Sequence, residues 1–125
     1  MGASLISGMQ SEGLIACPKH FPGMGRTEQD SHISTPVITA PQDALLAVDL
    51  LPFKKAIEAG AESIMTNHGL FVKLKFLLNK KATYTAFDPN NCATLSPILM
   101  TELLRKEMNF QGIILTDDLG RFCDV

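Results

Sequence analysis

The chain has 125 residues, of which 46% are hydrophobic and 19% are charged, and its formal net charge is −2. This length fits one ordinary domain, and the composition is typical of a folded globular chain rather than a disordered one. The small negative charge gives no reason to expect nucleic acid or an anionic membrane as partner, and no apolar run approaches the roughly 18 residues that a membrane span needs.

The N-terminal segment lacks the basic and apolar regions of a secretory signal, so we expect no leader peptide. The apolar run from Gly13 to Pro18 ends at a proline and predicts a short buried strand. The stretch from Lys19 to His32 follows, KHFPGMGRTEQDSH, with two histidines and almost no apolar periodicity. We predict a loop there, and its mixture of residue types is unusual for a purely structural loop.

A helix is predicted within the segment from Ala40 to Ala61, where apolar residues recur at helical spacing. Pro52 is expected to break or restart this helix because proline has no N–H group and crowds the preceding turn. Gly60 is a natural C-terminal cap. The next five residues, Glu62 to Thr66, predict a second strand that leads to His68.

A second helix is predicted from Ser96 to Phe110, with Ser96 as N-cap and Pro97 at the first helical position. Gly112 to Asp118 then predicts a third strand. The order strand, helix, strand, helix, strand favours an α/β fold with a parallel sheet and right-handed crossovers.

Each predicted strand runs into ionisable residues: Lys19 and His20, then His68, then Asp117 and Asp118. Function in parallel sheets collects at the carboxyl ends of the strands. We therefore expect an active site where these three strand ends meet.

The residues alone leave several roles open. The Asp117–Asp118 pair suits a nucleophile, a general base or a metal ligand, or it caps a following helix. In an extended chain Asp30 and His32 would face the same side, so that the carboxylate orients the imidazole for proton transfer; the alternative is a local turn. Lys19 and His20 either bind substrate oxygens or form a solvated loop edge.

Three cysteines, Cys17, Cys92 and Cys123, form neither a paired zinc spacing nor a disulfide framework, which indicates free thiols in a reducing cytoplasm. No local spacing gathers imidazoles and thiolates into a zinc site. We expect neither a metal nor a cofactor.

Three stretches, KHFPGMGRTEQDSH, AIEAGAESIMTNH and ATLSPILMTELLRKEMNFQGIILTDDLG, occur in the order in which family 3 glycoside hydrolases carry such motifs. The chain resembles the β-N-acetylhexosaminidase branch of that family over roughly residues 1 to 122. The resemblance implies a (β/α)8 TIM barrel and a substrate that is a small glycan containing N-acetylglucosamine, as in peptidoglycan recycling.

The resemblance also implies a retaining mechanism and assigns roles by position. Asp117 matches the catalytic nucleophile, His32 the general acid/base, and Asp30 its dyad partner. Lys19 and His20 match residues that bind sugar hydroxyls, and His68 falls where the family has a histidine near the sugar subsite.

The chain departs from this family pattern in length, since a (β/α)8 barrel takes about 250 residues. Its three predicted β/α units resemble strands four to six of the eight, so residues 1–125 are expected to be a fragment of the barrel domain with open sheet edges. Fifteen residues also separate His68 from Tyr84, and they predict a short amphipathic helix or an insertion without structure. The alternatives to an active glycosidase are therefore an inactive barrel fragment, a sugar-binding remnant, or a chain that needs a complementary barrel fragment.

Overall fold

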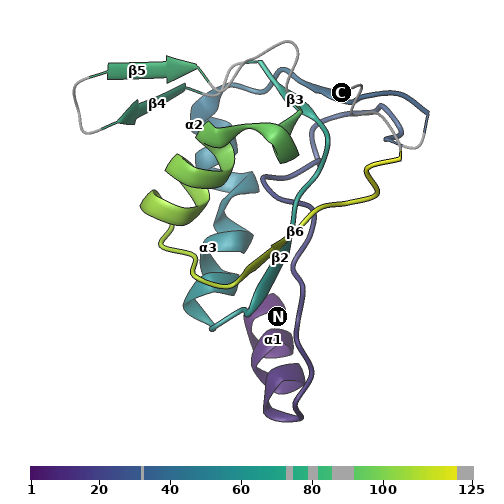
Figure 1. The fold of residues 1–125 in the computed structure, drawn as a ribbon, viewed down its shortest axis with the longest axis vertical. Helices are drawn as coiled ribbons and strands as arrows, with labels where there is room; N and C mark the ends of the chain where they lie inside the picture. The colour runs from purple at the N-terminus through teal and green to yellow at the C-terminus, as the bar shows by residue number, and fades with distance from the viewer. Residues whose placement is uncertain (32, 73–74, 79–81, 86–91, 121–125) are drawn as a thin grey trace.

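The computed structural model describes residues 1–31, 33–72, 75–78, 82–85 and 92–120, and it arranges them as short helices and two-stranded sheets (Figure 1). The mixture of helices and parallel strand pairs is an α/β arrangement, as predicted. In chain order the elements are α1 (Gly2–Ser11), β1 (Val37–Ile38), α2 (Gln42–Ala44), η1 (Leu45–Asp49), α3 (Leu51–Glu58), β2 (Ser63–Met65), β3 (Leu70–Phe71), β4 (Lys75–Leu78), β5 (Ala82–Thr85), η2 (Ala93–Leu95), η3 (Ile98–Glu107) and β6 (Ile113–Leu115).

The parallel pair β2–β6 confirms the second and third predicted strands. The paired residues are Ser63 with Ile113, Ile64 with Ile114 and Met65 with Leu115. Helix η3 lies between the two strands in sequence, as a crossover between parallel strands requires. A second parallel pair, β1–β3, was not predicted.

The first predicted strand, from Gly13 to Pro18, is wrong as an element, because the structure assigns no strand to these residues. The chain still runs beside β2 further on: Pro18 O accepts from Met65 N at 3.1 Å, and Phe21 N donates to Met65 O at 2.8 Å. Leu14 and Ile15 are more than half exposed, so the apolar run is not packed on both faces as a central strand would be.

The predicted helix before β2 is confirmed in three consecutive pieces, α2, η1 and α3. Pro52 lies in the first turn of α3, where a missing N–H group is tolerated. Gly60 has φ of +82° and follows the end of α3. Its N–H donates to Ile57 O at 2.9 Å, and Ala61 N donates to Ala56 O at 3.0 Å, which is the bond pattern of a Schellman cap.

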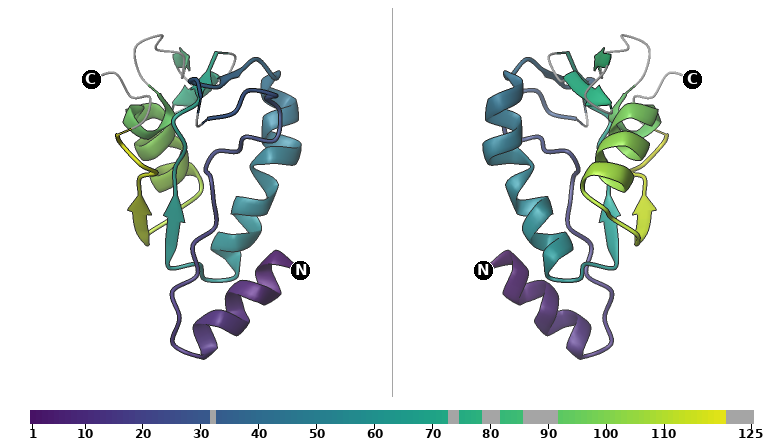
Figure 2. Two further views of the ribbon diagram at one scale, coloured as in Figure 1. Left: turned by 90° about the vertical axis from the view of Figure 1, so that its right-hand side faces the viewer. Right: turned by 90° about the vertical axis from the view of Figure 1, so that its left-hand side faces the viewer.

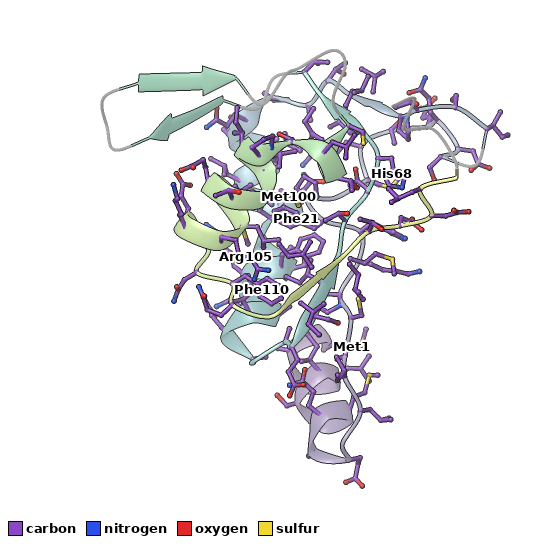
Figure 3. All side chains as sticks on the ribbon, viewed as in Figure 1. Met1, Phe21, His68, Met100, Arg105 and Phe110 are labelled. Atoms are coloured by element: carbon purple, nitrogen blue, oxygen red, sulfur yellow. The ribbon has the colours of Figure 1, made fainter. Side chains whose placement is uncertain are left out.

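The predicted helix from Ser96 to Phe110 is confirmed as η3, which is wound with π-helical bonds. Ser96 Oγ accepts from Leu99 N at 3.3 Å, so the serine caps the first turn as expected. At the other end Arg105 Nη1 donates to Phe110 O at 2.9 Å and to Gly112 O at 2.6 Å. The guanidinium also lies 5.4 Å from the ring centroid of Phe110 (Figure 3), so this side chain joins the helix to the start of β6.

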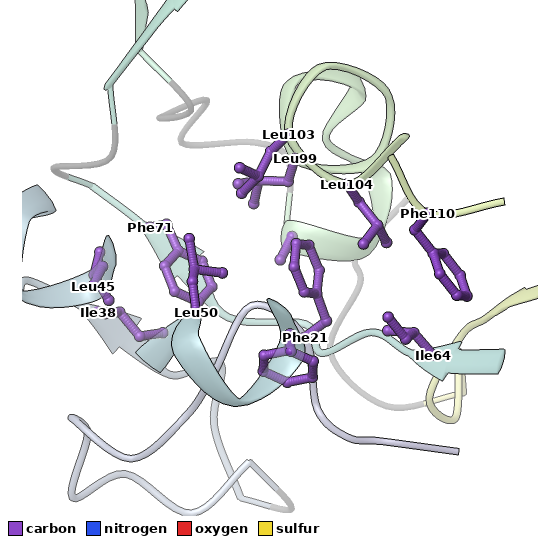
Figure 4. Close-up of a cluster of buried hydrophobic side chains, with 12 residues drawn as sticks. Phe21, Ile38, Leu45, Leu50, Ile64, Phe71, Leu99, Leu103, Leu104 and Phe110 are labelled. Carbon is purple, nitrogen blue, oxygen red and sulfur yellow. The ribbon is translucent and has the colours of Figure 1, made fainter. Parts of the chain in front are cut away.

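One main hydrophobic core lies between η3, α3 and the strands (Figure 4). Phe21 is fully buried in it and meets Phe53 edge to face, with ring centroids 5.3 Å apart. This burial anchors the segment that carries Lys19 and His20. The buried members are Phe21, Ile38, Leu45, Leu50, Phe53, Ile64, Phe71, Ala93, Leu99, Leu103, Leu104 and Phe110.

The N-terminal helix α1 was not predicted. It lies beyond the lower end of α3 (Figure 2), where Ile6 packs with Ala16, Ala56 and Ala61 in a small second cluster. Gln10 Nε2 donates to Gly60 O at 2.8 Å, and Gln10 Oε1 accepts from Glu62 N at 3.1 Å. Its glycines and serines have low helix propensity, so the tertiary contacts and not the local sequence identify this helix.

The segment after His68 is not the amphipathic helix that we expected. Its described parts are β3, β4 and the start of β5, and β4 pairs with β5 antiparallel, with Phe76 opposite Tyr84 (Figure 1). The sequence did not indicate these strands, because the leucines and lysines that dominate the segment also suit a helix. In the part of the chain that the structure describes, no helix has the length and apolar character to cross a membrane.

Candidate active site

Three segments that are distant in sequence lie side by side at the carboxyl end of β2. The segment at Phe21 forms an isolated parallel bridge with Thr66, and Thr66 N donates to Leu115 O at 2.9 Å. The first segment carries His20, the second His68 and the third Asp117. His20, His68 and Asp117 thus lie at one end of the sheet. The segment that carries His20 is on one side of β2, and the segment that carries Asp117 is on the other.

His20 and Asp117 are in contact. His20 Nε2 lies 3.4 Å from Asp117 Oδ2, and the two side chains are 30% and 42% exposed, so a ligand in solution has access to both. The other carboxylate oxygen, Asp117 Oδ1, accepts from Asp118 N at 2.9 Å. One oxygen of Asp117 is thus fixed by the backbone, while the other faces an imidazole in a partly open position.

His68 contacts the backbone that follows Asp117. Its Nε2 lies 3.1 Å from Asp118 O, and because a carbonyl oxygen only accepts hydrogen bonds, Nε2 carries the proton. Its Nδ1 lies 3.0 Å from Thr94 Oγ1 and 3.9 Å from Cys92 Sγ. His68 Nε2 thus holds the chain at Asp118, while Thr94 and Cys92 lie beside the other ring nitrogen.

Asp118 does not share the position of Asp117. Its Oδ1 accepts from Gly120 N at 2.9 Å, which closes a local turn. The adjacent carboxylates thus differ: Asp118 stabilises the turn after β6, whereas Asp117 contacts His20, a residue of another segment.

Lys19 and His20 lie on the wall of a cavity of about 590 Å³ between α1, α3 and the chain from Ala16 to Gly25. Its walls are otherwise mostly apolar, with Leu5, Ile6 and Phe53 among them. Asp117 and His68 do not line this cavity. It adjoins the candidate site from the side of Lys19 and His20 but does not contain it.

The predicted Asp30–His32 pair is only partly placed, because His32 lies outside the described residues. At Asp30 the structure gives two backbone hydrogen bonds: Asp30 O accepts from Ile33 N at 3.0 Å and from Ser34 N at 3.1 Å. The Asp30–His32 dyad stays a prediction.

The loop that carries Asp30 is tied to η1 by an ion pair. Arg26 Nε contacts Asp49 Oδ2, and the Asp49 side chain is only 9% exposed. Gly23, with φ of +126°, packs against the same aspartate, and a Cβ there would lie 3.1 Å from Asp49 Cβ. Glycine is thus required at this position both for its backbone conformation and for the close approach.

Two polar residues at this site were missed. Asn67 is 1% exposed, and Thr94 donates its hydroxyl to Asn67 O at 2.8 Å. A polar residue directly after a buried strand, as in MTNH, was the available signal for Asn67. No sequence pattern pointed to Thr94, which lies in the short helix η2.

The cysteines also differ from the expectation. Cys17 is a free thiol, whereas Cys92 is disulfide-bonded, and its sulfur partner lies outside the described residues. The expectation rested on sequence spacing, which does not report on contacts between distant segments. Among the residues that the structure describes, no three His, Cys, Asp or Glu side chains are grouped to hold a metal ion.

Comparison with known proteins gives one consistent result. The profile described as "Glycosyl hydrolase family 3 N terminal domain" matches residues 1–122. A β-hexosaminidase of Stenotrophomonas maltophilia (strain K279a) is 35% identical over 118 residues, which cover 94% of this chain and 31% of that relative.

Solved structures agree with the sequence comparison. The family 3 β-N-acetylglucosaminidase from Paenibacillus sp. str. FPU-7 has a TM-score of 0.79 at 34% identity, covering 95% of this chain and 20% of that one. NagZ from Neisseria gonorrhoeae, in complex with N-trifluoroacetyl-D-glucosamine, has a TM-score of 0.70 at 32% identity, covering 90% and 29% of the two chains. The chain thus spans about a third or less of the length of the relatives that it matches.

Proposed function

Because the chain belongs to the family of glycosyl hydrolase family 3 N-terminal domains, we propose that it supplies the catalytic nucleophile and part of the sugar site of a β-N-acetylhexosaminidase. The observation that carries this proposal is the contact of 3.4 Å between His20 Nε2 and Asp117 Oδ2 at the carboxyl end of the β2–β6 pair. This end is where parallel α/β folds place their active sites.

The proposed reaction is retaining hydrolysis in two steps. An oxygen of Asp117 attacks the anomeric carbon of a terminal β-linked N-acetylhexosamine, and the glycosidic bond breaks as protonated His32 gives its proton to the leaving oxygen. In the second step His32 takes a proton from water, the water oxygen bonds to the anomeric carbon, and the carboxylate of Asp117 is released. Asp30 is proposed to orient His32.

The sugar-binding roles go to residues around Asp117. Lys19 and His20 donate to sugar hydroxyls, and the partial exposure of the His20 side chain, 30%, supports its access to a ligand. His68 lies at the edge of the same subsite, where its bond to Asp118 O keeps the nucleophile's segment in place. The substrate is proposed to be a glycan that ends in N-acetylglucosamine, as in peptidoglycan recycling.

We further propose that the chain forms part of a (β/α)8 barrel that a complementary fragment completes. Support comes from β6, whose residues Ile113 and Leu115 are 54% and 41% exposed, and from the coverage of 31% of a relative's length. In a closed barrel every strand has two neighbours, and such side chains are covered. The alternative is that the chain is an inactive or sugar-binding remnant. It is favoured by the same observation, that the match covers only 31% of the relative's length.

The test combines the chain alone with a graft. Residues 1–122 replace the matched segment of a full-length β-hexosaminidase relative, and release of nitrophenol from a nitrophenyl N-acetylglucosaminide is measured. The chain alone is expected to release little or none, and the folded graft is expected to turn over the substrate. Asp117→Asn should abolish this turnover, whereas Asp118→Asn should retain part of it.

Two results separate the alternatives. A graft that folds but shows no turnover, while it still binds N-acetylglucosamine, would favour the sugar-binding remnant. Turnover that survives Asp117→Asn would refute the proposed nucleophile.

A further inference from the structure

Asn67 is a fully buried amide at the end of β2, between the segments that carry His20 and Asp117. A buried amide is costly unless its polar atoms are paired. Asn67 Nδ2 donates to His20 O at 3.2 Å and lies 3.5 Å from Gly23 O, and Asn67 Oδ1 accepts from Gly69 N at 2.8 Å. Its side chain therefore spans from its own strand to the turn after Lys19.

The turn from His20 to Gly23 is held by Asn67 through both main chain and side chain. Asn67 N donates to Phe21 O at 2.9 Å, so the carbonyl groups of His20, Phe21 and Gly23 all face this one residue. The turn itself is closed by Gly23 N, which donates to His20 O at 2.8 Å. The orientation of the backbone at His20 thus depends on the amide of Asn67.

The neighbours of Asn67 hold the opposite segment in the same way. Thr66 donates to Leu115 O from its N at 2.9 Å and from its Oγ1 at 3.2 Å, and His68 Nε2 reaches Asp118 O. Three consecutive residues thus bind two segments on either side of β2: Asn67 the one with His20, Thr66 and His68 the one with Asp117. The contact between His20 and Asp117 joins the two segments that these three residues hold in place.

We propose that Asn67 is a positioning residue that sets the His20 imidazole against the Asp117 carboxylate. It acts through the backbone carbonyl of His20, to which its side-chain amide donates. The positioning of His20 by Asn67 concerns the geometry of the chain alone. The effect of this positioning on hydrolysis rests on the proposed function.

The test uses the full chain and two variants of Asn67. Asn67→Asp keeps the shape and the acceptor for Gly69 N but replaces the donors by an oxygen that faces two carbonyl groups. Asn67→Ala removes all three side-chain hydrogen bonds without adding charge. The matched control is Ser63→Ala, because Ser63 is 2% exposed and its Oγ donates to a backbone carbonyl, Ala16 O, at 3.0 Å, at the amino end of the same strand.

The readout is the NMR signal of the His20 ring and its response to Asp117→Asn. In the wild-type chain and in Ser63→Ala, the Asp117→Asn change should shift the His20 ring resonances by the same amount. In Asn67→Ala and Asn67→Asp this shift should fall to less than half, because the ring no longer lies beside the carboxylate. A merely structural role would lower the shift equally in Ser63→Ala and overturn the proposal, as would an unchanged shift in Asn67→Ala.

A measurement on the wild-type chain decides the case if neither variant folds. The side-chain amide protons of Asn67 should exchange with solvent far more slowly than those of exposed Gln111, and equal rates would overturn the proposal. Binding of N-acetylglucosamine is measured separately by titration. If the His20 resonance shift depends on Asn67 but the chain does not bind the sugar, the proposed function is refuted and the positioning role of Asn67 is not.

Discussion

Gly112 tests the parallel pairing that brings Asp117 to the site, because it lies where the chain passes closest to the start of β2. A Cβ at Gly112 would lie 2.3 Å from Glu62 O, 2.8 Å from Glu62 C and 2.6 Å from the tip of the Phe110 ring. Its φ is not positive, so the constraint is space rather than backbone conformation. Gly112→Ala therefore has to move β6 away from β2.

The size of the effect follows from these distances. An ordinary C···O contact is about 3.3 Å or longer, so the strand must move by about 1 Å. The hydrogen bond from Ile113 N to Glu62 O, 2.8 Å in the structure, would then be broken. Overpacking of this kind costs about 1–3 kcal/mol and a lost hydrogen bond about 0.5–1.5 kcal/mol. We expect Gly112→Ala to lower the free energy of unfolding by about 2–4 kcal/mol.

The assay is thermal unfolding followed by circular dichroism. At about 2.1 cal/mol/K per residue, each kcal/mol corresponds to about 4 °C, so Tm should fall by about 8–15 °C. The matched control is Gly8→Ala in α1, where a Cβ meets no atom within 4 Å. This change should raise stability by about 0.5–1 kcal/mol. Equal small effects at both glycines would refute the close β2–β6 register.

Two further predictions concern the ends of the same strand pair. Arg105→Gln should lower the free energy of unfolding by about 1.5–3 kcal/mol in urea titrations, because it weakens charge-assisted bonds to Phe110 O and Gly112 O, and a change below about 0.5 kcal/mol would contradict that account. Replacing the exposed Ile113 and Leu115 by threonine should change the stability of the chain alone by no more than about 0.5 kcal/mol. The same double variant should weaken association with a polypeptide that supplies the rest of the barrel, as measured by co-purification, and unchanged association would count against that interface.

The elements that the sequence predicted correctly are those with strong local signals. The cap at Gly60, the restart at Pro52 and the Ser96 cap each depend on a single residue whose chemistry acts on its own turn, so the sequence carries the information. The strands β2 and β6 are short apolar runs bounded by polar residues, which is the pattern of buried parallel strands.

The errors arise where tertiary contacts decide the conformation. Helix α1 depends on Ile6 packing and on the two hydrogen bonds of Gln10 to residues about fifty positions away. The apolar run from Gly13 to Pro18 has the composition of a strand, yet it lacks a full set of ladder partners in the described chain. Periodicity in one segment does not report which segments lie beside it.

The candidate site, like the fold, was predictable from the sequence only in part. The sequence indicated His20, His68 and Asp117 because each follows an apolar run, and the structure gives their contacts. Their separate surroundings were not predictable: the bond of His68 to a backbone carbonyl and the buried amide of Asn67 both depend on contacts between segments distant in sequence. The roles of all six candidate residues stay predictions: Lys19, His20, Asp30, His32, His68 and Asp117.

The most direct test of the central claim is to locate the covalent intermediate. The graft of residues 1–122 is incubated with a fluorinated N-acetylglucosaminyl fluoride, from which a carboxylate oxygen displaces fluoride at the anomeric carbon, and the labelled peptide is sequenced by mass spectrometry. The account predicts one glycosyl ester, on Asp117, that is absent in Asp117→Asn. A graft that hydrolyses substrate but carries the ester on Asp118 or on any other residue would contradict it.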